Sequence, residues 1–212
     1  MLTLDHLVVV APDLAEGAAH VRACLGLDMP EGGRHPEMGT RNHLLRLGAS
    51  TFLELIAVDP EAAPPARVRW FGLDDAARVR ADWEAGRRLR GFVARTDDLD
   101  TLLPAHPDRL GTAATMTQGT LSWRFGLRPD GTWPADGAAP CAMDWGARPH
   151  PAGTMPDLGA QLDEMWLTHP EPEAMAALYA GLGLTDPPRI EPGPTLRWTA
   201  RIATPSGLRT LT

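Results

Sequence analysis

The chain has 212 residues and a formal net charge of −7 at pH 7, enough for one large domain or two small ones with a real core. The acidic balance and the lack of a basic stretch argue against nucleic acid or an anionic membrane as the main partner. No apolar run is long enough to cross a bilayer and no secretory signal pattern is visible, so we expect a cytoplasmic enzyme or binding protein.

Residues 1–60 are expected to form the first structural unit. Residues 3–10 are mostly β-formers and predict a strand that is buried on both faces. Asp13 is a suitable N-cap for the helix that follows, and Gly26 is a suitable residue to end it. After a loop over residues 32–36, the pattern predicts two further strands near 42–47 and 51–57.

Two more units follow the first. Residues 61–89 predict a connecting segment with a short helix, and residues 90–150 predict a second strand-helix unit with strands near 111–117, 120–127 and 139–145. Residues 160–212 predict a truncated third unit with one helix and strands near 195–203 and 207–212. A small sheet alone leaves one face uncovered, so we expect this unit to pack on the first two or on a second copy of the chain.

Two polar residues interrupt the apolar strands of the first unit. His6 shares a strand face with Leu4 and Val8, and Glu54 shares a face with Phe52 and Ile56. The opposite faces are purely apolar and suit helix packing. An unpaired buried carboxylate costs several kcal/mol, so Glu54 is expected to have a partner: a metal, a histidine or an arginine. A hydrogen bond between Glu54 and His6 in a metal-free pocket is the simpler alternative.

Several motifs resemble the glyoxalase-like domain group of the vicinal-oxygen-chelate superfamily. They are Leu4-Asp5-His6, the run from Gly32 to Asn42 that contains Gly-Arg-His-Pro, Leu53-Glu54-Leu55-Ile56-Ala57, Arg95-Thr96-Asp97-Asp98-Leu99 and the segment ending Met143-Asp144-Trp145. The resemblance implies an α+β fold of paired βαβββ modules whose curved mixed sheets enclose a cleft, here followed by a truncated third βαββ module.

In many members of that superfamily the cleft holds a divalent metal. The resemblance places His6 and Glu54 at two ligand positions of the first module and Asp144 opposite Glu54, whereas Gly91 takes the place of an expected ligand in the second module. A histidine with two carboxylates would hold Zn, Mn, Ni or Fe.

Five further residues are candidates for substrate binding, each with a simpler alternative. His35 and Asn42 belong to the loop that the resemblance marks, but turn chemistry also explains them. Arg95 and Arg124 would hold an anionic group if both faced the cleft, but each could instead neutralise a buried carboxylate. Trp145 would be a pocket wall or an ordinary core aromatic.

Two functions follow from these residues. The first is a small-molecule enzyme, a metal-dependent lyase, isomerase or dioxygenase that acts on an oxygen-chelating, anionic substrate with Glu54 as its catalytic carboxylate. The second is a metal-free protein of the same fold that binds or sequesters a small molecule, which the glycine at position 91 favours. The chain has no lysine, so Schiff-base and phosphate-loop lysine chemistry is excluded. A homodimer is the expected assembly if the third unit serves as a scaffold.

Overall fold

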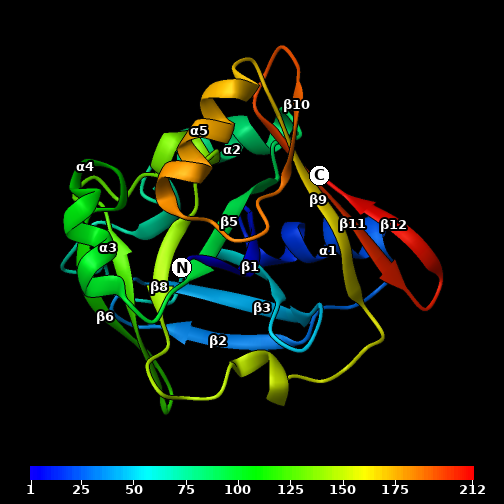
Figure 1. Cartoon of the computed structure of the whole chain (residues 1–212). Coiled ribbons are helices and arrows are strands. Elements are labelled where there is room, and N and C mark those ends of the chain that lie inside the picture. Colours follow the sequence, from blue (N-terminus) through cyan, green and yellow to red (C-terminus); the bar gives the residue numbers. More distant parts are fainter.

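The computed structural model describes all residues from 1 to 212 (Figure 1). The strands are β1 (Thr3–Val10), β2 (Glu31–His35), β3 (Thr40–Arg46), β4 (Phe52–Val58), β5 (Leu89–Arg95), β6 (Thr112–Gln118), β7 (Leu121–Leu127), β8 (Cys141–Asp144), β9 (Gln161–His169), β10 (Arg189–Pro192), β11 (Arg197–Thr204) and β12 (Gly207–Leu211). The helices are α1 (Leu14–Leu25), α2 (Ala76–Glu84), α3 (Leu99–Ala105), α4 (Pro107–Leu110) and α5 (Pro172–Leu182). None of these helices is long and apolar enough to span a bilayer.

The first eight strands form one curved sheet in the order β2-β3-β4-β1-β5-β8-β7-β6. Strand β1 runs parallel to β4, β5 runs parallel to β8, and β1 and β5 pair antiparallel at the centre. Each half of the sheet therefore repeats the same topology. The outermost strands β2 and β6 approach each other, so the sheet is nearly closed. The expected fold of paired βαβββ modules with curved mixed sheets is confirmed.

Local sequence signals explain the ends of helix α1. The Asp13 side chain accepts a hydrogen bond from the Glu16 backbone N–H, and Gly26 takes a left-handed φ of 70° after the last turn. The sequence did not predict strand β2: we interpreted residues 32–36 as a loop. They pair with β3 as an edge strand, with a register irregularity between Glu31 and Arg34.

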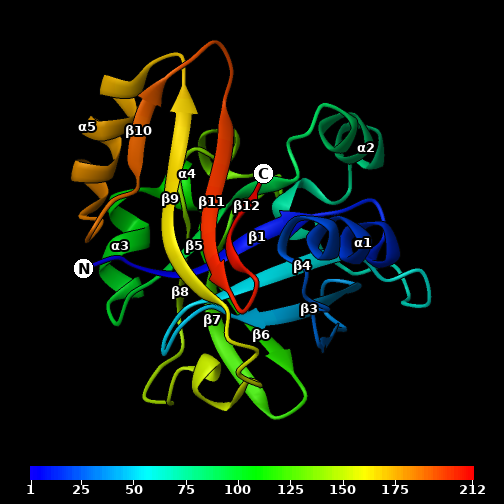
Figure 2. The ribbon, with the colours of Figure 1, turned by 90° about the vertical axis from the view of Figure 1, so that its right-hand side faces the viewer.

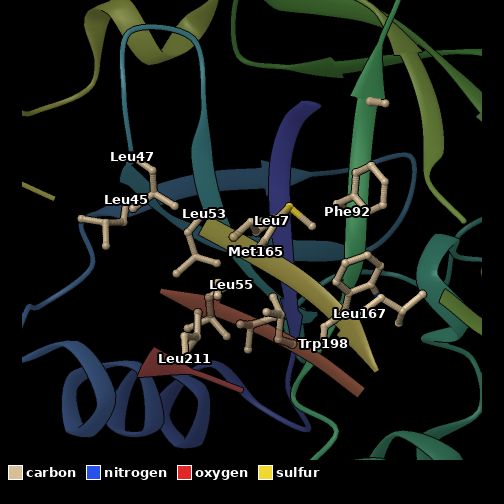
Figure 3. Close-up of a cluster of buried hydrophobic side chains, with 14 of the residues drawn as sticks. Leu7, Leu45, Leu47, Leu53, Leu55, Phe92, Met165, Leu167, Trp198 and Leu211 are labelled. Carbon is tan, nitrogen blue, oxygen red and sulfur yellow. The ribbon is translucent and has the colours of Figure 1, made fainter. Parts of the chain in front are cut away.

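The third unit forms a separate four-stranded sheet in the order β10-β9-β11-β12, and the short strand β10 adds to the strands expected there. This sheet lies across the convex face of the larger sheet (Figure 2). Met165, Leu167 and Trp198 pack against Leu7 and Leu53 in one buried cluster (Figure 3). Burial of each such side chain stabilises the folded chain by about 1.5–3 kcal/mol. The third unit therefore packs on the first two units of the same chain.

The two faces of β1 serve different purposes. Leu7 and Val9 point into the core between the two sheets, whereas Val8 and Val10 belong to a second buried cluster on the concave side. Alternation along the strand puts His6 on that concave side as well. The core on the convex face fixes β1 and β4 rigidly, and thereby fixes the polar side chains that they carry into the concave side.

Candidate functional site

A pocket opens on the concave side of the eight-stranded sheet. Its floor and one wall are polar, formed by His6, His35, Asn42, Glu54 and Gln118. The other walls are mostly aromatic, formed by Phe52, Trp70, Phe71, Trp123, Phe125 and Trp145, and Pro151 and Met155 also line the pocket. The free volume is about 50 Å³, which is enough for a few atoms, such as the reactive end of a ligand.

Three ionisable side chains form a line at the floor of this pocket. His6 Nδ1–H donates to Asp5 Oδ1 over 2.7 Å, and His6 Nε2 lies 3.6 Å from Glu54 Oε2. All three residues are buried, and the His6 ring stacks on Phe52 with 4.5 Å between the ring centroids. The imidazole therefore lies between two buried carboxylates with its ring plane fixed.

A β-bulge turns Asp5 toward His6. Strict alternation would send consecutive residues of a strand to opposite faces. The pairing of β1 with β5 shifts between Leu4 and His6, so Asp5 has no partner in the register. The bulge lets Asp5 and His6 hydrogen-bond to each other, which the sequence pattern alone does not reveal.

Asp5 is the most heavily bonded side chain of the site. Besides His6, it accepts a hydrogen bond from Trp145 Nε1 at 2.9 Å and is bonded to His150 Nε2 at 3.0 Å, while Arg95 Nη1 lies 3.6 Å away. The His150 side chain is only 13% exposed and holds the segment after β8 onto Asp5. Neither Asp5 nor His150 was among the predicted site residues.

These contacts shift the pKa values of all three groups. Burial alone would lower the pKa of His6, but the carboxylates of Asp5 and Glu54 outweigh it and raise the pKa to about 9. Burial alone would raise the pKa of Asp5 and of Glu54, but hydrogen bonds from the histidines hold both below their usual range. At neutral pH the site thus contains an imidazolium between two carboxylates, and Arg95 supplies the second positive charge.

A neutral hydrogen-bond network extends from Glu54 along the polar wall. Asn42 Nδ2 donates to Glu54 Oε1 at 2.7 Å, and Asn42 Oδ1 accepts from Gln118 Nε2 at 3.3 Å. Gln118 Nε2 also donates to His35 Nε2 at 3.2 Å. Burial lowers the pKa of His35, which keeps its ring neutral and able to accept this bond. Strand β3 thus brings Asn42 to Glu54, and β6 adds Gln118, which we did not predict.

The structure places the two candidate arginines outside the pocket. Arg95 Nη1 donates to the carbonyl oxygens of Leu4 and Ser50 beside Asp5, and Arg124 forms a two-point ion pair with Asp100 on α3. This corrects the expectation that they converge on an anionic substrate. Arg124 follows Trp123 on β7, and since Trp123 faces the pocket, alternation turns Arg124 to the opposite face.

Asp144 does not join His6 and Glu54 either. Met143 and Trp145 on each side of it line the pocket, so alternation turns Asp144 away, and its Oδ1 accepts a hydrogen bond from the Gly146 backbone N–H in a turn. This corrects its assignment as a third metal ligand.

The donors present do not fit a divalent metal. No group of three or more His, Cys, Asp or Glu side chains is placed to hold one. The residue paired with His6 on β5 is Val93, and a Cβ atom added at Gly91 would lie 2.9 Å from the ring of Trp133, so an aromatic ring occupies the space of the expected ligand. Metal sites in proteins require at least three or four donors. Of the histidine and carboxylate side chains in this pocket, His6 and Glu54 face each other as an ion pair 3.6 Å apart, and His35 is hydrogen-bonded to Thr40 and Gln118 instead.

The fold and the pocket define a class: a mixed α/β protein with a curved sheet around a small pocket. Residues 4–183 match the model of the glyoxalase-like domain, and the chain belongs to that family. The resemblance seen in the sequence motifs is therefore confirmed. No curated protein matches the chain.

Solved structures with similar folds are remote in sequence. A hypothetical protein from Staphylococcus aureus is 11% identical with a TM-score of 0.64, over 93% of this chain and 88% of that one. Methylmalonyl-CoA epimerase from Mycobacterium tuberculosis is 19% identical with a TM-score of 0.41, over 69% and 88% of the chains. The epimerase from Streptomyces coelicolor, in complex with 2-nitronate-propionyl-CoA, is 18% identical with a TM-score of 0.38, over 71% and 99%.

Proposed function

We propose that this protein is a small-molecule enzyme that moves a proton at a carbon atom next to a carbonyl group, as an isomerase or lyase does. The observation that carries the proposal is the buried line Asp5–His6–Glu54 at the floor of a mostly aromatic pocket. A carboxylate and an imidazolium held side by side form a base and an acid, the two groups that proton transfer requires.

The roles follow from which atoms are available. Glu54 accepts the proton from the substrate carbon, and the electron pair of the broken C–H bond moves onto the carbonyl oxygen. His6 Nε2–H, which lies 3.6 Å from Glu54, donates a hydrogen bond to that oxygen and stabilises its negative charge. Return of the proton from Glu54 to the same or a neighbouring carbon completes an isomerisation.

Substrate binding would itself strengthen the base. In the free protein, contacts with His6 lower the pKa of Glu54. A substrate oxygen that takes the His6 Nε2–H removes one of those contacts and so raises the pKa of Glu54 toward its ordinary value. Asp5 keeps its bond to His6 Nδ1 throughout and acts as a positioning residue for the imidazolium.

The remaining pocket residues suggest the substrate class. No arginine lines the pocket, so we infer a largely apolar substrate rather than the anionic one expected from the sequence. Trp70 lines the pocket as part of its aromatic wall, and its Nε1–H is buried without a hydrogen-bond partner. Asn42 and Gln118 provide further amide groups.

Hydrogen–deuterium exchange tests the proposal without knowledge of the final product. A panel of small ketones, aldehydes and esters is incubated with the protein in D₂O, and loss of the α-proton signal is followed by NMR. Glu54→Gln is expected to lower the exchange rate about 100-fold or more. Asp144→Asn, which alters a carboxylate outside the pocket, should leave the rate unchanged. Compounds that bind but show no Glu54-dependent exchange would overturn the proposal.

Sequestration of a small molecule without chemistry is the second candidate, and the aromatic wall of the pocket favours it. Trp123 and Trp145 lie 5.4 Å apart between ring centroids, and stacking on such rings binds planar ligands without any catalytic group. In that case Glu54→Gln would leave ligand affinity unchanged. Metal-dependent chemistry, which the sequence analysis expected, is tested by metal analysis: stoichiometric Zn, Mn, Ni or Fe lost on His6→Ala would reject both metal-free candidates.

A further inference from the structure

Part of the pocket wall comes from an irregular segment between the two sheets. Residues 146–159 (the strap) run from β8 to β9 along the lower side of the molecule in Figures 1 and 2, and their only regular element is the 3₁₀ turn Pro151–Thr154. Pro151 and Met155 of the strap line the pocket, and both residues are partly exposed. Because the free volume is only about 50 Å³, a ligand of more than a few atoms needs a wall that can move.

Few polar contacts tie the strap to the rest of the chain. Its backbone–backbone hydrogen bonds are internal and lie within residues 150–155, so no strand ladder holds it. In its first part, Arg148 Nη1 donates to the carbonyl oxygen of Thr120 at 2.8 Å. Near its end, Asp157 lies 3.8 Å from Arg46 in an ion pair, and such pairs contribute little where solvent reaches them. A segment with so few contacts opens at a lower free energy than the sheet beside it.

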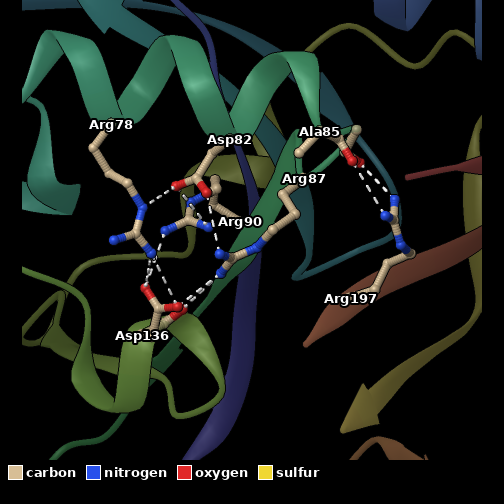
Figure 4. Close-up of polar contacts among 8 residues, drawn as sticks. Arg78, Asp82, Ala85, Arg87, Arg90, Asp136 and Arg197 are labelled. Carbon is tan, nitrogen blue, oxygen red and sulfur yellow. Dashed lines mark hydrogen bonds and ion pairs between the residues drawn. The ribbon is translucent and has the colours of Figure 1, made fainter. Parts of the chain in front are cut away.

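Other irregular segments beside the large sheet are tied down more firmly. Asp136, in the loop before β8, is bonded to Arg78 at 3.2 Å and to Arg87 at 3.0 Å (Figure 4). In the segment that carries two aromatic pocket residues, the Gly72 backbone N–H donates to the Gly131 carbonyl oxygen at 2.9 Å. The strap is therefore the part of the pocket wall that moves at the lowest cost.

His150 joins the strap to the floor of the pocket. The Ala152 backbone N–H donates to His150 Nδ1 at 3.2 Å, so the ring carries its proton on Nε2 and donates it to Asp5 Oδ2 at 3.0 Å. The other oxygen of that carboxylate, Oδ1, accepts from His6 Nδ1–H at 2.7 Å. His150 and His6 thus donate to the same carboxylate, and a movement of the strap changes what Asp5 offers to His6.

We propose that the strap is a lid over the pocket, and that His150 is its latch and a positioning residue for His6. With the lid closed, the His150 N–H takes up part of the negative charge of Asp5, so Asp5 holds the His6 proton less strongly. His6 Nε2–H is then a better donor to a substrate oxygen. Opening breaks the latch and moves Pro151 and Met155 away from the pocket, which admits the ligand. The effect on the substrate oxygen rests on the proposed function, whereas the latch is a property of the free chain.

Proton NMR of the free chain tests the positioning role. The signal of His6 Nδ1–H reports the hydrogen bond to Asp5. His150→Leu removes the second donor to this carboxylate and should move the signal downfield, because Asp5 then attracts the His6 proton more strongly. His150→Gln supplies an amide N–H in place of the imidazole N–H and should restore most of the original position.

Hydrogen–deuterium exchange of the backbone, followed by mass spectrometry, tests the lid. In the unaltered chain the amides of Gly153 and Met155 should exchange at least about tenfold faster than those of β1, because local opening of the strap exposes them and leaves the sheet intact. His150→Leu removes a hydrogen bond to a carboxylate and should speed the exchange of these strap amides by a further factor of about ten.

The control is Arg148→Leu, which removes the other hydrogen bond of the strap without touching Asp5. It should speed the exchange of the strap amides and leave the His6 signal where it is. A His6 signal that shifts equally in Arg148→Leu and His150→Leu would mean that loosening of the strap, and not the loss of the donor, moves it, and would overturn the positioning role.

Two further results would overturn the proposal: strap amides that exchange as slowly as those of β1, or a His6 signal that is the same in His150→Leu as in the unaltered chain. If His150→Leu does not fold, His150→Asn, whose amide is too short to reach Asp5, takes its place. Neither measurement uses a substrate. The lid and latch can therefore fail while Glu54-dependent exchange of α-protons stands, and they can hold where that exchange is absent.

Discussion

The two halves of the eight-stranded sheet have the same topology and opposite chemistry. The first half places His6, Glu54 and Asn42 on the concave side, whereas the corresponding side of the second half carries Val93 and Met143. Gly91, the counterpart of His6, lies beneath the Trp133 ring. A duplicated fold therefore does not require a duplicated site: one half holds the ionisable groups, and the other supplies the apolar wall against which they act.

Removal of His6 is the strongest way to test this division. His6→Ala leaves the carboxylates of Asp5 and Glu54 buried without the cation between them, and the free energy of unfolding should fall by about 3–5 kcal/mol. Met143→Leu, on the apolar half of the same pocket, should cost less than about 1.5 kcal/mol. Urea denaturation at pH 7 measures both, and equal losses would refute the division into a polar and an apolar half.

The pH dependence of stability provides the second test. The pKa of His6 is raised from its ordinary 6.5 to about 9 in the folded chain. Folding therefore gains stability from His6 that is fully present below pH 6.5 and is lost as the pH rises through 9. The gain is on the order of 3 kcal/mol.

The comparison chain for that test is His6→Gln, which has no titratable group at this position. Its stability deficit, followed by urea denaturation, should shrink as the pH is raised from about 6.5 to above 9. A deficit that is constant over this range would mean that His6 is neutral in the folded protein.

Loss of a single donor to Asp5 should have a smaller effect. Trp145→Phe removes the Nε1–H that donates to the Asp5 carboxylate and should cost about 1.5–3 kcal/mol beyond the change in packing. Trp123→Phe is the matched control, since this ring lies on the same wall and has no hydrogen bond to the carboxylate. In thermal unfolding, the melting temperature of Trp145→Phe should be lower than that of Trp123→Phe. The reverse order would count against the role of Asp5.

The smallest effect is expected at Asp144. Its carboxylate is partly exposed and only accepts a turn hydrogen bond from the Gly146 N–H, so Asp144→Asn should change the free energy of unfolding by no more than about 0.5 kcal/mol. The melting temperature of the Asp144→Asn variant should respond to added Zn or Mn as that of the unaltered chain does. A metal response that this substitution abolishes would restore Asp144 as a ligand.

Local signals predicted much of the fold and part of the site. The run of β-forming residues predicted β1 over its observed bounds, and capping by Asp13 and Gly26 predicted α1, because these depend on neighbours within a few positions. The two-residue period of side chains along a strand put His6 and Glu54 on one side of the sheet. Strand β2 was missed because its glycine-rich residues form an edge strand only through pairing with β3.

The tertiary structure alone decided what surrounds His6. The bulge at Asp5 depends on register with β5, and His150 and Trp145 reach Asp5 from about 140 residues away in the chain, a distance over which no local pattern carries information. Asp144 and Arg124 looked equivalent to the other candidates because the residue type does not specify a strand face. The sequence by itself thus determined a duplicated fold with a polar pair in its first half, and long-range pairing made that pair a buried, charged line.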